Sequence, residues 1–288
     1  MINFYLPNFY DFPFCILNAY FIENIKENPD LFYDDVQIGA VYGTFPSVIW
    51  NGGRFKKGSA SIKEICNTIS YYNNVNIPIR FTYTNTLIEE KHLEDVYANI
   101  VTELANNGKN EILVNHPILE EYLRNRYPEY KFLSSTTKCM LDNNDIIAES
   151  DKYFLTVLDY RKNTDFDFLA SLPNPEKYEI LINAYCSPYC KNRSEHYDIL
   201  SASQLEDVYR DIQCPIKKDS FFEALKEFST VIKVEDLYTT YVNMGFKHFK
   251  IEGRTNNIID VLESYIYYMV KPEYHNKVRY EVLKNILN

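Results

Sequence analysis

The sequence lacks the motifs of several common enzyme classes. It has only 8 glycines, and it contains neither a G-x-G-x-x-G nor a Walker A pattern, so a glycine-rich phosphate cradle is not expected. An H-E-x-x-H motif, a nucleophile elbow and an obvious Ser–His pair are also missing. Internal repeats and Gly/Ser linkers are not found either. These absences remove the usual nucleotide cradle and the usual protease motifs from consideration.

Positive charge and long apolar runs are also in short supply. The chain carries 30 Lys and Arg against 40 Asp and Glu, a net charge of −10, whereas non-specific nucleic-acid binding needs clustered cations. The most apolar early stretch, residues 9–22, is interrupted by Asp11, Pro13 and Asn18, and it is shorter than a membrane span. We therefore expect a cytoplasmic protein with no membrane segment and no nucleic-acid partner. A local basic pocket for a small anion remains compatible with this charge.

Short β-branched or aromatic runs alternate with amphipathic helical stretches along the chain. The expected strands cover residues 36–42, 78–84, 111–115, 131–135, 153–159, 179–183, 230–234 and 248–252. The clearest helical patterns cover residues 90–106, 117–127, 202–212, 234–244 and 256–269. Strands that alternate with helices indicate βαβ units and a parallel sheet. Eight such units are what a closed barrel requires, whereas an open doubly wound sheet usually has fewer strands.

The fold class that we predict is α/β, a single-domain (β/α)8 TIM-like barrel over residues 1–288. We expect residues 1–35 to be an N-terminal extension and residues 271–288 to be a C-terminal helical tail. In such barrels the active face lies where the strands end and the helices begin. The connection over residues 185–203 is long, and long loops inside compact domains are often functional.

Three of the six cysteines fall on or after this long connection. Cys186 and Cys190 are followed by Arg193 and His196 in N-A-Y-C-S-P-Y-C-K-N-R-S-E-H, and Cys214 comes later. In a cytosolic chain, clustered cysteines indicate metal binding or catalysis rather than disulfides. Thiolates on a turn can converge on iron or zinc, and three cysteines with His196 would make a Cys3His zinc site. The alternative is three unrelated buried cysteines, and the spacing does not separate zinc from iron–sulfur.

Two further motifs place charged residues at expected strand ends. In the last strand, alternation puts His248, Lys250 and Glu252 on one face, which would point into the barrel, and Arg254 opens the following loop. Buried charges of this kind need a partner, so they indicate either a structural ion pair between Lys250 and Glu252 or a ligand site.

The third motif follows the first expected strand and contains the only tryptophan. Gly52 and Gly53 permit positive φ and close approach of a ligand, and Arg54 is suited to clamp a carboxylate. An equally good interpretation is a structured turn that caps the barrel mouth.

Together these motifs resemble the collagenase-like U thirty-two (U32) peptidase family of barrel proteins. The family pattern reads approximately Asn-x-x-Cys, then Cys-x-x-Arg-x-x-His, and later an Asp-Leu segment that leads into Phe-Lys-Ile-Glu-Gly-Arg. This chain has the corresponding residues from Asn183 to His196, and Asp236-Leu237 followed by Phe249 to Arg254. The resemblance covers about residues 178–270, and in the first half it consists mainly of the barrel rhythm.

The resemblance implies a 4Fe–4S cluster at the barrel mouth and oxygen-independent hydroxylation or another group transfer. By residue matching, Cys186, Cys190 and Cys214 would be the ligands, and Asn183 and His196 would support the cluster loop. Arg54, Arg193, Lys250, Glu252 and Arg254 would position a small anionic substrate. The family generally uses four cysteines, so a fourth ligand is open here, with Cys139 and His196 as candidates.

Three hypotheses follow for the function of the chain. The first is an iron–sulfur enzyme that resembles the U32 peptidase family. The second is a zinc-binding barrel in which the metal is hydrolytic or structural. The third is a non-catalytic barrel that serves as a scaffold beside a homologous partner subunit, because relatives act in heterodimers.

Overall fold

A closed barrel of eight parallel strands forms the centre of the chain, as expected from the alternation of strand and helix patterns in its sequence. The computed structural model describes every residue except 211, 213, 215–217, 219, 254–256 and 288. Within these residues the strands follow one another around the barrel in chain order, from β1 to β8. The strands are β1 Ile2–Pro7, β2 Val36–Gly43, β3 Ile79–Tyr83, β4 Glu111–Val114, β5 Lys131–Ser134, β6 Leu155–Val157, β7 Tyr178–Leu181 and β8 His248–Lys250.

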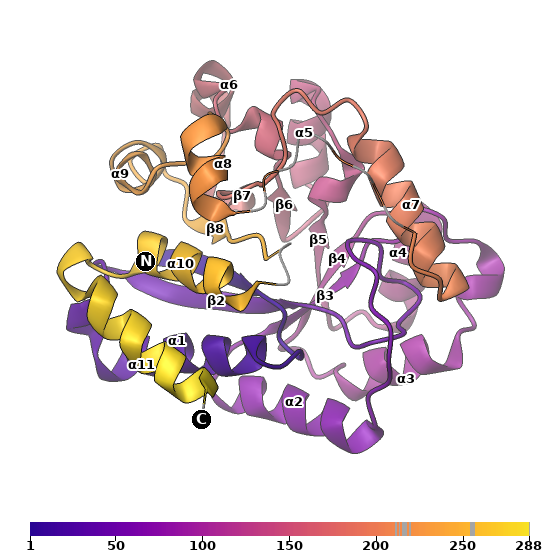
Figure 1. Ribbon diagram of the computed structural model, residues 1–288. Helices are drawn as coiled ribbons and strands as arrows, with labels where there is room; N and C mark the ends of the chain where they lie inside the picture. Colours follow the sequence, from indigo (N-terminus) through magenta and orange to yellow (C-terminus); the bar gives the residue numbers. More distant parts are fainter. Residues whose placement is uncertain (211, 213, 215–217, 219, 254–256, 288) are drawn as a thin grey trace. The chain divides into compact units, whose positions relative to one another are not determined.

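Helices follow the strands, as Figure 1 shows by colour along the chain. The α-helices are α1 Phe14–Glu27, α2 Ile62–Asn74, α3 Val96–Leu104, α4 Pro117–Arg126, α5 Asn143–Ser150, α6 Phe166–Ser171, α7 Arg193–Glu206, α8 Phe221–Glu227, α9 Val234–Asp236, α10 Ile258–Met269 and α11 His275–Leu287. Shorter helical turns are η1 Pro29–Leu31, η2 Glu90–His92, η3 Thr136–Lys138, η4 Tyr160–Lys162, η5 Pro175–Lys177, the π-type turn η6 Leu237–Tyr241 and η7 Pro272–Tyr274.

Local sequence accounts for where several of these helices begin. Ser61 accepts a hydrogen bond from the Glu64 backbone at the start of α2, and the Glu64 side chain bonds back to the Ser61 backbone. Asp142 caps α5 in a similar way through two backbone N–H groups. Pro117 is the first residue of α4, where a missing N–H removes no helical hydrogen bond.

The two ends of the predicted strand order need correction. Residues 1–35 are not an extension, because they contain β1, which pairs with β8 and closes the barrel. The strand expected at residues 230–234 is absent: this segment is a turn and irregular backbone that lead into α9 at Val234. It makes one backbone hydrogen bond to the end of β7, from Ile232 N–H to Ile182 C=O at 2.9 Å. The sheet edge of β7 is already paired with β8, so no strand can form there.

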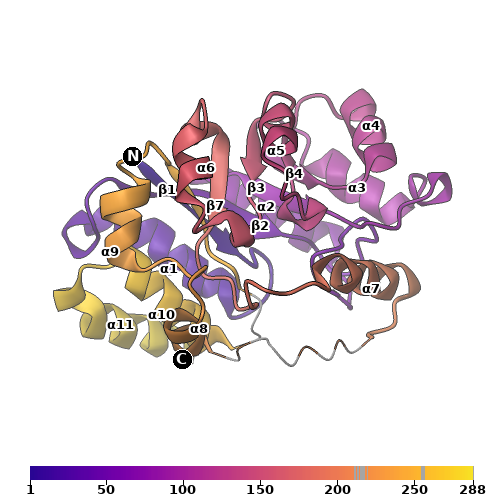
Figure 2. The same cartoon turned by 90° about the horizontal axis from the view of Figure 1, so that it is seen from above.

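The chain divides into two compact units. The first unit contains Met1–Val41, Tyr160–Tyr189 and Ile216–Asn288. Its helices α1, α10 and α11 contact one another and lie side by side in both ribbon views (Figures 1 and 2). Phe21 and Tyr265 pack edge to face at 5.1 Å, and the Tyr265 hydroxyl donates to Asn18 Oδ1 at 2.8 Å. The C-terminal tail is helical as expected, and it is packed against this core.

The second unit contains Tyr42–Asp159 and Cys190–Pro215. Its largest buried side chain is Trp50, whose ring meets Tyr83 edge to face at 5.3 Å. The Trp50 indole N–H donates to the His92 carbonyl at 2.8 Å, so this loop is held to the core. The motif with the only tryptophan therefore builds the core of this unit.

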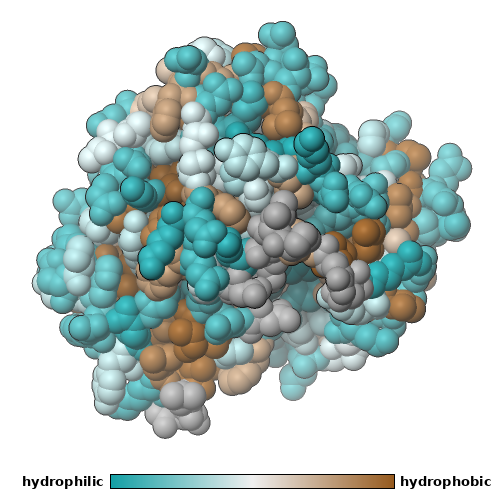
Figure 3. All heavy atoms as spheres, turned by 45° about the horizontal axis from the view of Figure 1, so that its top comes forward, coloured by the Kyte–Doolittle hydropathy of each residue, from teal (hydrophilic) through white to brown (hydrophobic). Residues whose placement is uncertain are grey.

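Most large hydrophobic side chains of the described residues are buried, and the exposed ones are scattered along the chain. Figure 3 shows the same pattern on one face, where hydrophilic residues dominate and hydrophobic residues form separate patches. No helix of the described part is long and apolar enough to cross a membrane.

Candidate functional site

Asn183 joins the ends of β7 and β8. Its side-chain amide donates to the Glu252 carbonyl at 3.0 Å, and its Oδ1 accepts from the Glu252 backbone N–H at 2.5 Å. The amide also lies 3.5 Å from the Ser264 hydroxyl on α10. Asn183 and Ser264 are completely buried, so these bonds form without competition from water. The residue that we expected to support the cysteine loop thus fixes the segment leading into it.

Tyr185 extends this polar group toward α8 and α10. Its ring is completely buried, and burial followed by the charge of Asp260 raises the pKa of its hydroxyl. Asp260 Oδ1 accepts from the Phe221 N–H at the start of α8 at 2.8 Å, and the Tyr185 carbonyl accepts from Lys218 N–H at 3.0 Å. We call Asn183, Tyr185, Glu252, Asp260 and Ser264 the β7–β8 network. No sequence motif points to Asp260, because its side chain meets this segment only through the fold.

Cys186 follows the β7–β8 network directly and is nearly buried. Its side chain is 5 % exposed and packs in an apolar cluster with Tyr160, Leu181 and Ala184. The Tyr160 hydroxyl donates to the Ser187 carbonyl at 3.0 Å, which fixes the next residue of the loop. Cys186 is therefore a shielded thiol on a segment held from both sides.

Cys190 and Cys214 differ from Cys186 in their surroundings. Both are partly exposed, and none of the six cysteines forms a disulfide. The His196 ring is partly exposed and lies 5.8 Å from the Tyr197 ring. Free thiols on irregular backbone suit a metal centre in donor type. Outside the ten undescribed positions, however, no three His, Cys, Asp or Glu side chains are gathered as metal ligands. The iron–sulfur cluster and the zinc alternative both stay predictions.

Arg193 is buried where the long connection enters α7. Its Nε lies 3.0 Å from Asp159 Oδ2, just after β6, and its Nη2 donates to the Thr136 hydroxyl at 3.1 Å. The guanidinium carbon lies 5.1 Å from the centre of the Tyr197 ring, within cation–π range. The sequence identified Arg193 as a charge near the cysteines, whereas its partner Asp159 becomes apparent only in the structure.

Lys250 and Glu179 form an ion pair between neighbouring strands. Both are nearly or fully buried, and Lys250 Nζ lies 3.8 Å from Glu179 Oε1. Lys250 is opposite Leu181 and Glu179 is opposite His248 in the parallel register, so all four share one face of the sheet. The alternation predicted from the sequence is therefore confirmed for β8. The structure also pairs Lys250 with Glu179 of β7, a partner that is remote from it in sequence.

The turn after β2 is built by interactions within the second unit. The Asn51 side-chain amide donates to the Arg54 carbonyl, and Asn51 Oδ1 accepts from Thr82 at 2.9 Å. A Cβ on Gly52 would lie 2.4 Å from the Thr84 carbonyl oxygen, so the close approach here is between two backbone segments. This geometry favours the structured-turn interpretation. Arg54 itself is half-buried at the end of the turn.

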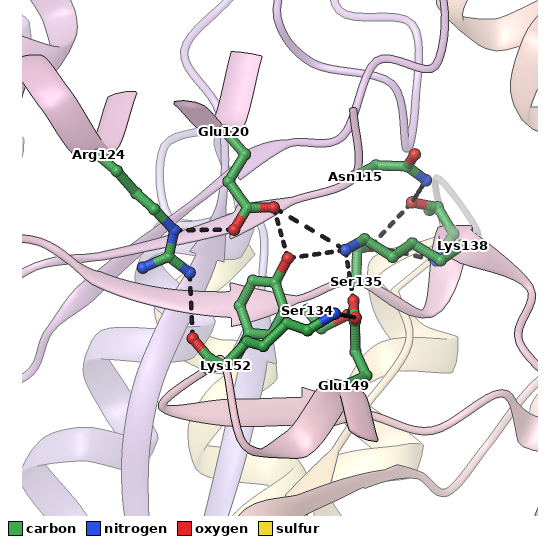
Figure 4. Close-up of polar contacts among 10 residues, drawn as sticks. Asn115, Glu120, Arg124, Ser134, Ser135, Lys138, Glu149 and Lys152 are labelled. Atoms are coloured by element: carbon green, nitrogen blue, oxygen red, sulfur yellow. Dashed lines mark hydrogen bonds and ion pairs between the residues drawn. The ribbon is translucent and has the colours of Figure 1, made fainter. Parts of the chain in front are cut away.

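Cys139, a candidate fourth ligand, follows a dense polar cluster. Its thiol lies 3.5 Å from the Thr137 carbonyl. The neighbouring Lys138 Nζ bonds Glu149 Oε1 at 2.5 Å and the Tyr153 hydroxyl at 2.9 Å, and Tyr153 donates to Glu120 (Figure 4). We call Glu120, Lys138, Glu149 and Tyr153 the Lys138 cluster. Its members satisfy one another, which is typical of a structural clamp.

Arg254, the remaining residue of the predicted site, lies outside the described residues. The fold and this distribution of buried polar groups define a TIM-like barrel whose strand ends carry the candidate site, which is where enzymes of this architecture keep their active sites.

Comparison with known proteins identifies similar chains. No protein-family model matches this sequence. An uncharacterized protease of Methanocaldococcus jannaschii is 26 % identical over 234 residues, which cover 76 % of this chain and 68 % of that protein. The solved structure of the U32 peptidase Mk0906 matches 88 % of this chain and 94 % of its own with a TM-score of 0.56, at 11 % identity. The structural match supports the fold, and the resemblance to the U32 peptidase family that the motifs indicated is confirmed.

Proposed function

We propose that this chain is an enzyme that acts on a small anionic substrate at the carboxyl ends of its barrel strands. In this proposal Cys186, Cys190 and Cys214 hold a 4Fe–4S cluster. When bound, such a cluster supplies electrons or a Lewis-acidic iron, which suits oxygen-independent hydroxylation or a related group transfer.

The observation that carries the proposal is the β7–β8 network beneath Cys186. It gathers two carboxylates, a phenol, an amide and a hydroxyl, each no more than 7 % exposed. Burying such groups is unfavourable unless they are well bonded, and a barrel needs none of them for stability. Three of them, Asn183, Tyr185 and Glu252, follow the carboxyl ends of β7 and β8, where barrel enzymes keep their active sites. Rigid support of this kind is what a functional loop requires.

The chain's own residues then have separable roles. Asn183 and Tyr185 hold the backbone that leads to Cys186, and Asp260 fixes that segment to the start of α8. Asp159 and Thr136 hold the Arg193 guanidinium in one orientation. Among the described residues, Lys250, Arg193 and Arg54 are the cations that we propose for orienting the anionic substrate. Glu252 is the residue that we propose for holding or accepting a proton.

The test is metal analysis of protein purified without oxygen. We expect a brown protein with about four irons and four sulfides per chain, as in other Cys-ligated four-iron clusters. Cys186→Ala and Cys190→Ala should each lose most of the iron. Cys66→Ala is the matched control, because Cys66 is also partly exposed but lies on α2.

Other outcomes have clear meanings. A colourless protein with one zinc that is lost in His196→Ala would replace this proposal by the zinc barrel. Iron content that survives both cysteine substitutions would contradict the ligand assignment. A metal-free protein that co-purifies with a second barrel chain would indicate a non-catalytic subunit.

A further inference from the structure

A pocket of about 590 Å³ is lined by residues of the second unit alone. Three segments line it: the loop after β3, the start of α4 and the C-terminal half of α7. The loop after β3 and His116 both follow the carboxyl end of a barrel strand, where ligands of this fold class usually bind. None of the residues of the predicted cysteine site lines this pocket.

His116 has no structural partner for its ring. It is the N-cap residue of α4, but its side chain makes no capping hydrogen bond. Its Nδ1 is buried and has no hydrogen-bond partner among the residues that the structure describes. Burial also lowers the pKa of the imidazole below its usual value. Buried polar atoms are almost always bonded in native proteins, so an unbonded one that borders a pocket points to a missing ligand.

His92 contributes a second neutral imidazole to the same pocket. Its Nδ1 accepts a hydrogen bond from the Glu89 backbone N–H at 2.9 Å. An Nδ1 that accepts a bond carries no proton, so the ring is neutral and its proton is on Nε2. The indole N–H of Trp50 donates a hydrogen bond of 2.8 Å to the His92 carbonyl and so fixes the backbone of His92. The pocket therefore contains a fixed imidazole donor together with an imidazole nitrogen that lacks a partner.

The rest of the lining is apolar or already neutralised. Leu87 forms part of the wall and is 40 % exposed, and Ile88 and Leu205 provide further aliphatic surface. The two carboxylates of the lining have cations of their own. Glu89 pairs with Lys91 at 2.7 Å, and Glu206 pairs with Arg210. A bound ion would therefore have no unpaired opposite charge to interact with, whereas a bound aliphatic group would pack against the aliphatic side chains of the lining.

We propose that this pocket, the His92–His116 pocket, binds a small uncharged carboxamide that carries a branched aliphatic group. An amide offers an oxygen acceptor and an N–H donor on neighbouring atoms. These are the two complements that one imidazole N–H and one imidazole lone pair require. A carboxylate or an ammonium group would instead lose hydration beside two neutral rings without gaining a countercharge. The binding would not depend on the metal centre.

The experiment compares three probes that share one aliphatic skeleton. These are 3-methylbutanamide, 3-methylbutanoate and 3-methylbutylammonium, titrated at neutral pH into the full chain with ¹⁵N-labelled histidine. We expect the amide to shift the ring signals of His92 and His116 and to bind at least about five-fold more tightly than either ion, a difference of about 1 kcal/mol. Equal or tighter binding of an ion, or unmoved ring signals with the amide, would overturn the proposal.

Two variants separate binding from folding. His116→Phe keeps a planar aromatic ring, slightly larger than imidazole, but removes both nitrogens, so we expect at least about five-fold weaker amide binding with unchanged thermal stability, since no observed bond is lost. Ala202→Leu fills the pocket from α7 and should block the amide without touching either histidine. His275→Phe is the control, because it removes an imidazole bond to Val270 in the first unit. Unchanged amide affinity in both pocket variants would contradict the site. Cys186→Ala protein should bind the amide normally, which separates this proposal from the metal proposal.

Discussion

Each compact unit has a buried ion pair between neighbouring barrel strands, and the two pairs differ in geometry. In the second unit, Arg80 of β3 and Glu111 of β4 are direct neighbours in the register, and Arg80 Nε lies 2.7 Å from Glu111 Oε2. In the first unit, Lys250 and Glu179 are offset along β8 and β7 and are 3.8 Å apart. The Arg80–Glu111 pair is a charge-assisted hydrogen bond, whereas the distance between Lys250 and Glu179 is too long for one.

The pairs also differ in how they lie along their strands, because Glu179 is the second residue of β7 whereas Lys250 is at the far end of β8. Arg80 and Glu111 stand at the amino-terminal ends of β3 and β4, and this end of such barrels is associated with stability. Lys250 is the last residue of β8 and is followed by Glu252 and the β7–β8 network. The pair at the amino-terminal strand ends is thus closed by a hydrogen bond, whereas the pair that reaches the end of β8, where the candidate site begins, has a longer separation between its charges. The following predictions test this distinction.

The largest effect is expected from Arg80→Met. It leaves the Glu111 carboxylate buried without its cation, which costs about 3–5 kcal/mol of unfolding free energy in comparable pairs. Urea unfolding of the full chain measures this loss. Lys57→Met is the control for an exposed pair, because Lys57 and Asp207 are 65 % and 58 % exposed, and its effect should stay below about 1 kcal/mol. Adding Glu111→Leu to Arg80→Met should restore much of the stability. Similar losses for the buried and the exposed pair would remove the structural role assigned to Arg80.

The next largest effect is expected from one of two adjacent glycines in the turn after β2. Gly52→Ala drives a Cβ to 2.4 Å from the Thr84 carbonyl oxygen, so we expect a loss of about 3 kcal/mol. Gly53→Ala meets only the Thr84 hydroxyl at 3.7 Å, an ordinary contact, and should change stability by less than about 1 kcal/mol. Thermal unfolding of both variants compares them directly. If Gly53→Ala were the more damaging substitution, the backbone approach would not explain the Gly-Gly pair.

Lys250→Met should reduce stability less than Arg80→Met. Its Nζ makes no hydrogen bond to Glu179, so we expect a loss of about 1–2 kcal/mol, below that of the closed pair. The iron content should stay at the wild-type level, because Lys250 is proposed to orient substrate and not to bind metal. A loss as large as that of Arg80→Met would show that both pairs serve mainly the fold. Loss of iron would move Lys250 into the support of the metal centre.

Much of the barrel could be predicted from the sequence because seven of its strands are short β-branched or aromatic runs followed by helical patterns. The sequence pattern does not reveal the strand at residues 2–7 and instead predicts one at residues 230–234. Both segments are apolar, and only pairing with β8 decides which of them enters the sheet. The site shows the same limit. Cys186, Lys250 and Arg193 were recognisable by type, but their surroundings depend on residues that are remote in sequence, such as Asp260, Glu179 and Asp159.

The smallest effect concerns pH and the Lys138 cluster of the second unit. Burial acts to raise the pKa of Glu149, but hydrogen bonds from Lys138 and Ser134, with the charges of Lys138 and Lys152, leave it below its ordinary value of 4.5. A carboxyl with a depressed folded-state pKa stabilises the fold fully above pH 4.5 and loses that contribution as pH falls through the folded pKa.

Glu149→Gln should therefore lower the unfolding free energy at neutral pH by less than about 1 kcal/mol, because the group is partly solvated. The difference from the wild type should shrink once the pH falls below 4.5. Glu129→Gln, an exposed change outside the Lys138 cluster, controls for the loss of one negative charge. Denaturant unfolding at several pH values gives the difference directly. A difference that is constant with pH would mean that Glu149 acts through shape rather than charge. A stability difference that shrinks at low pH would show that the Lys138 cluster, like the Arg80–Glu111 pair, stabilises the fold through paired charges.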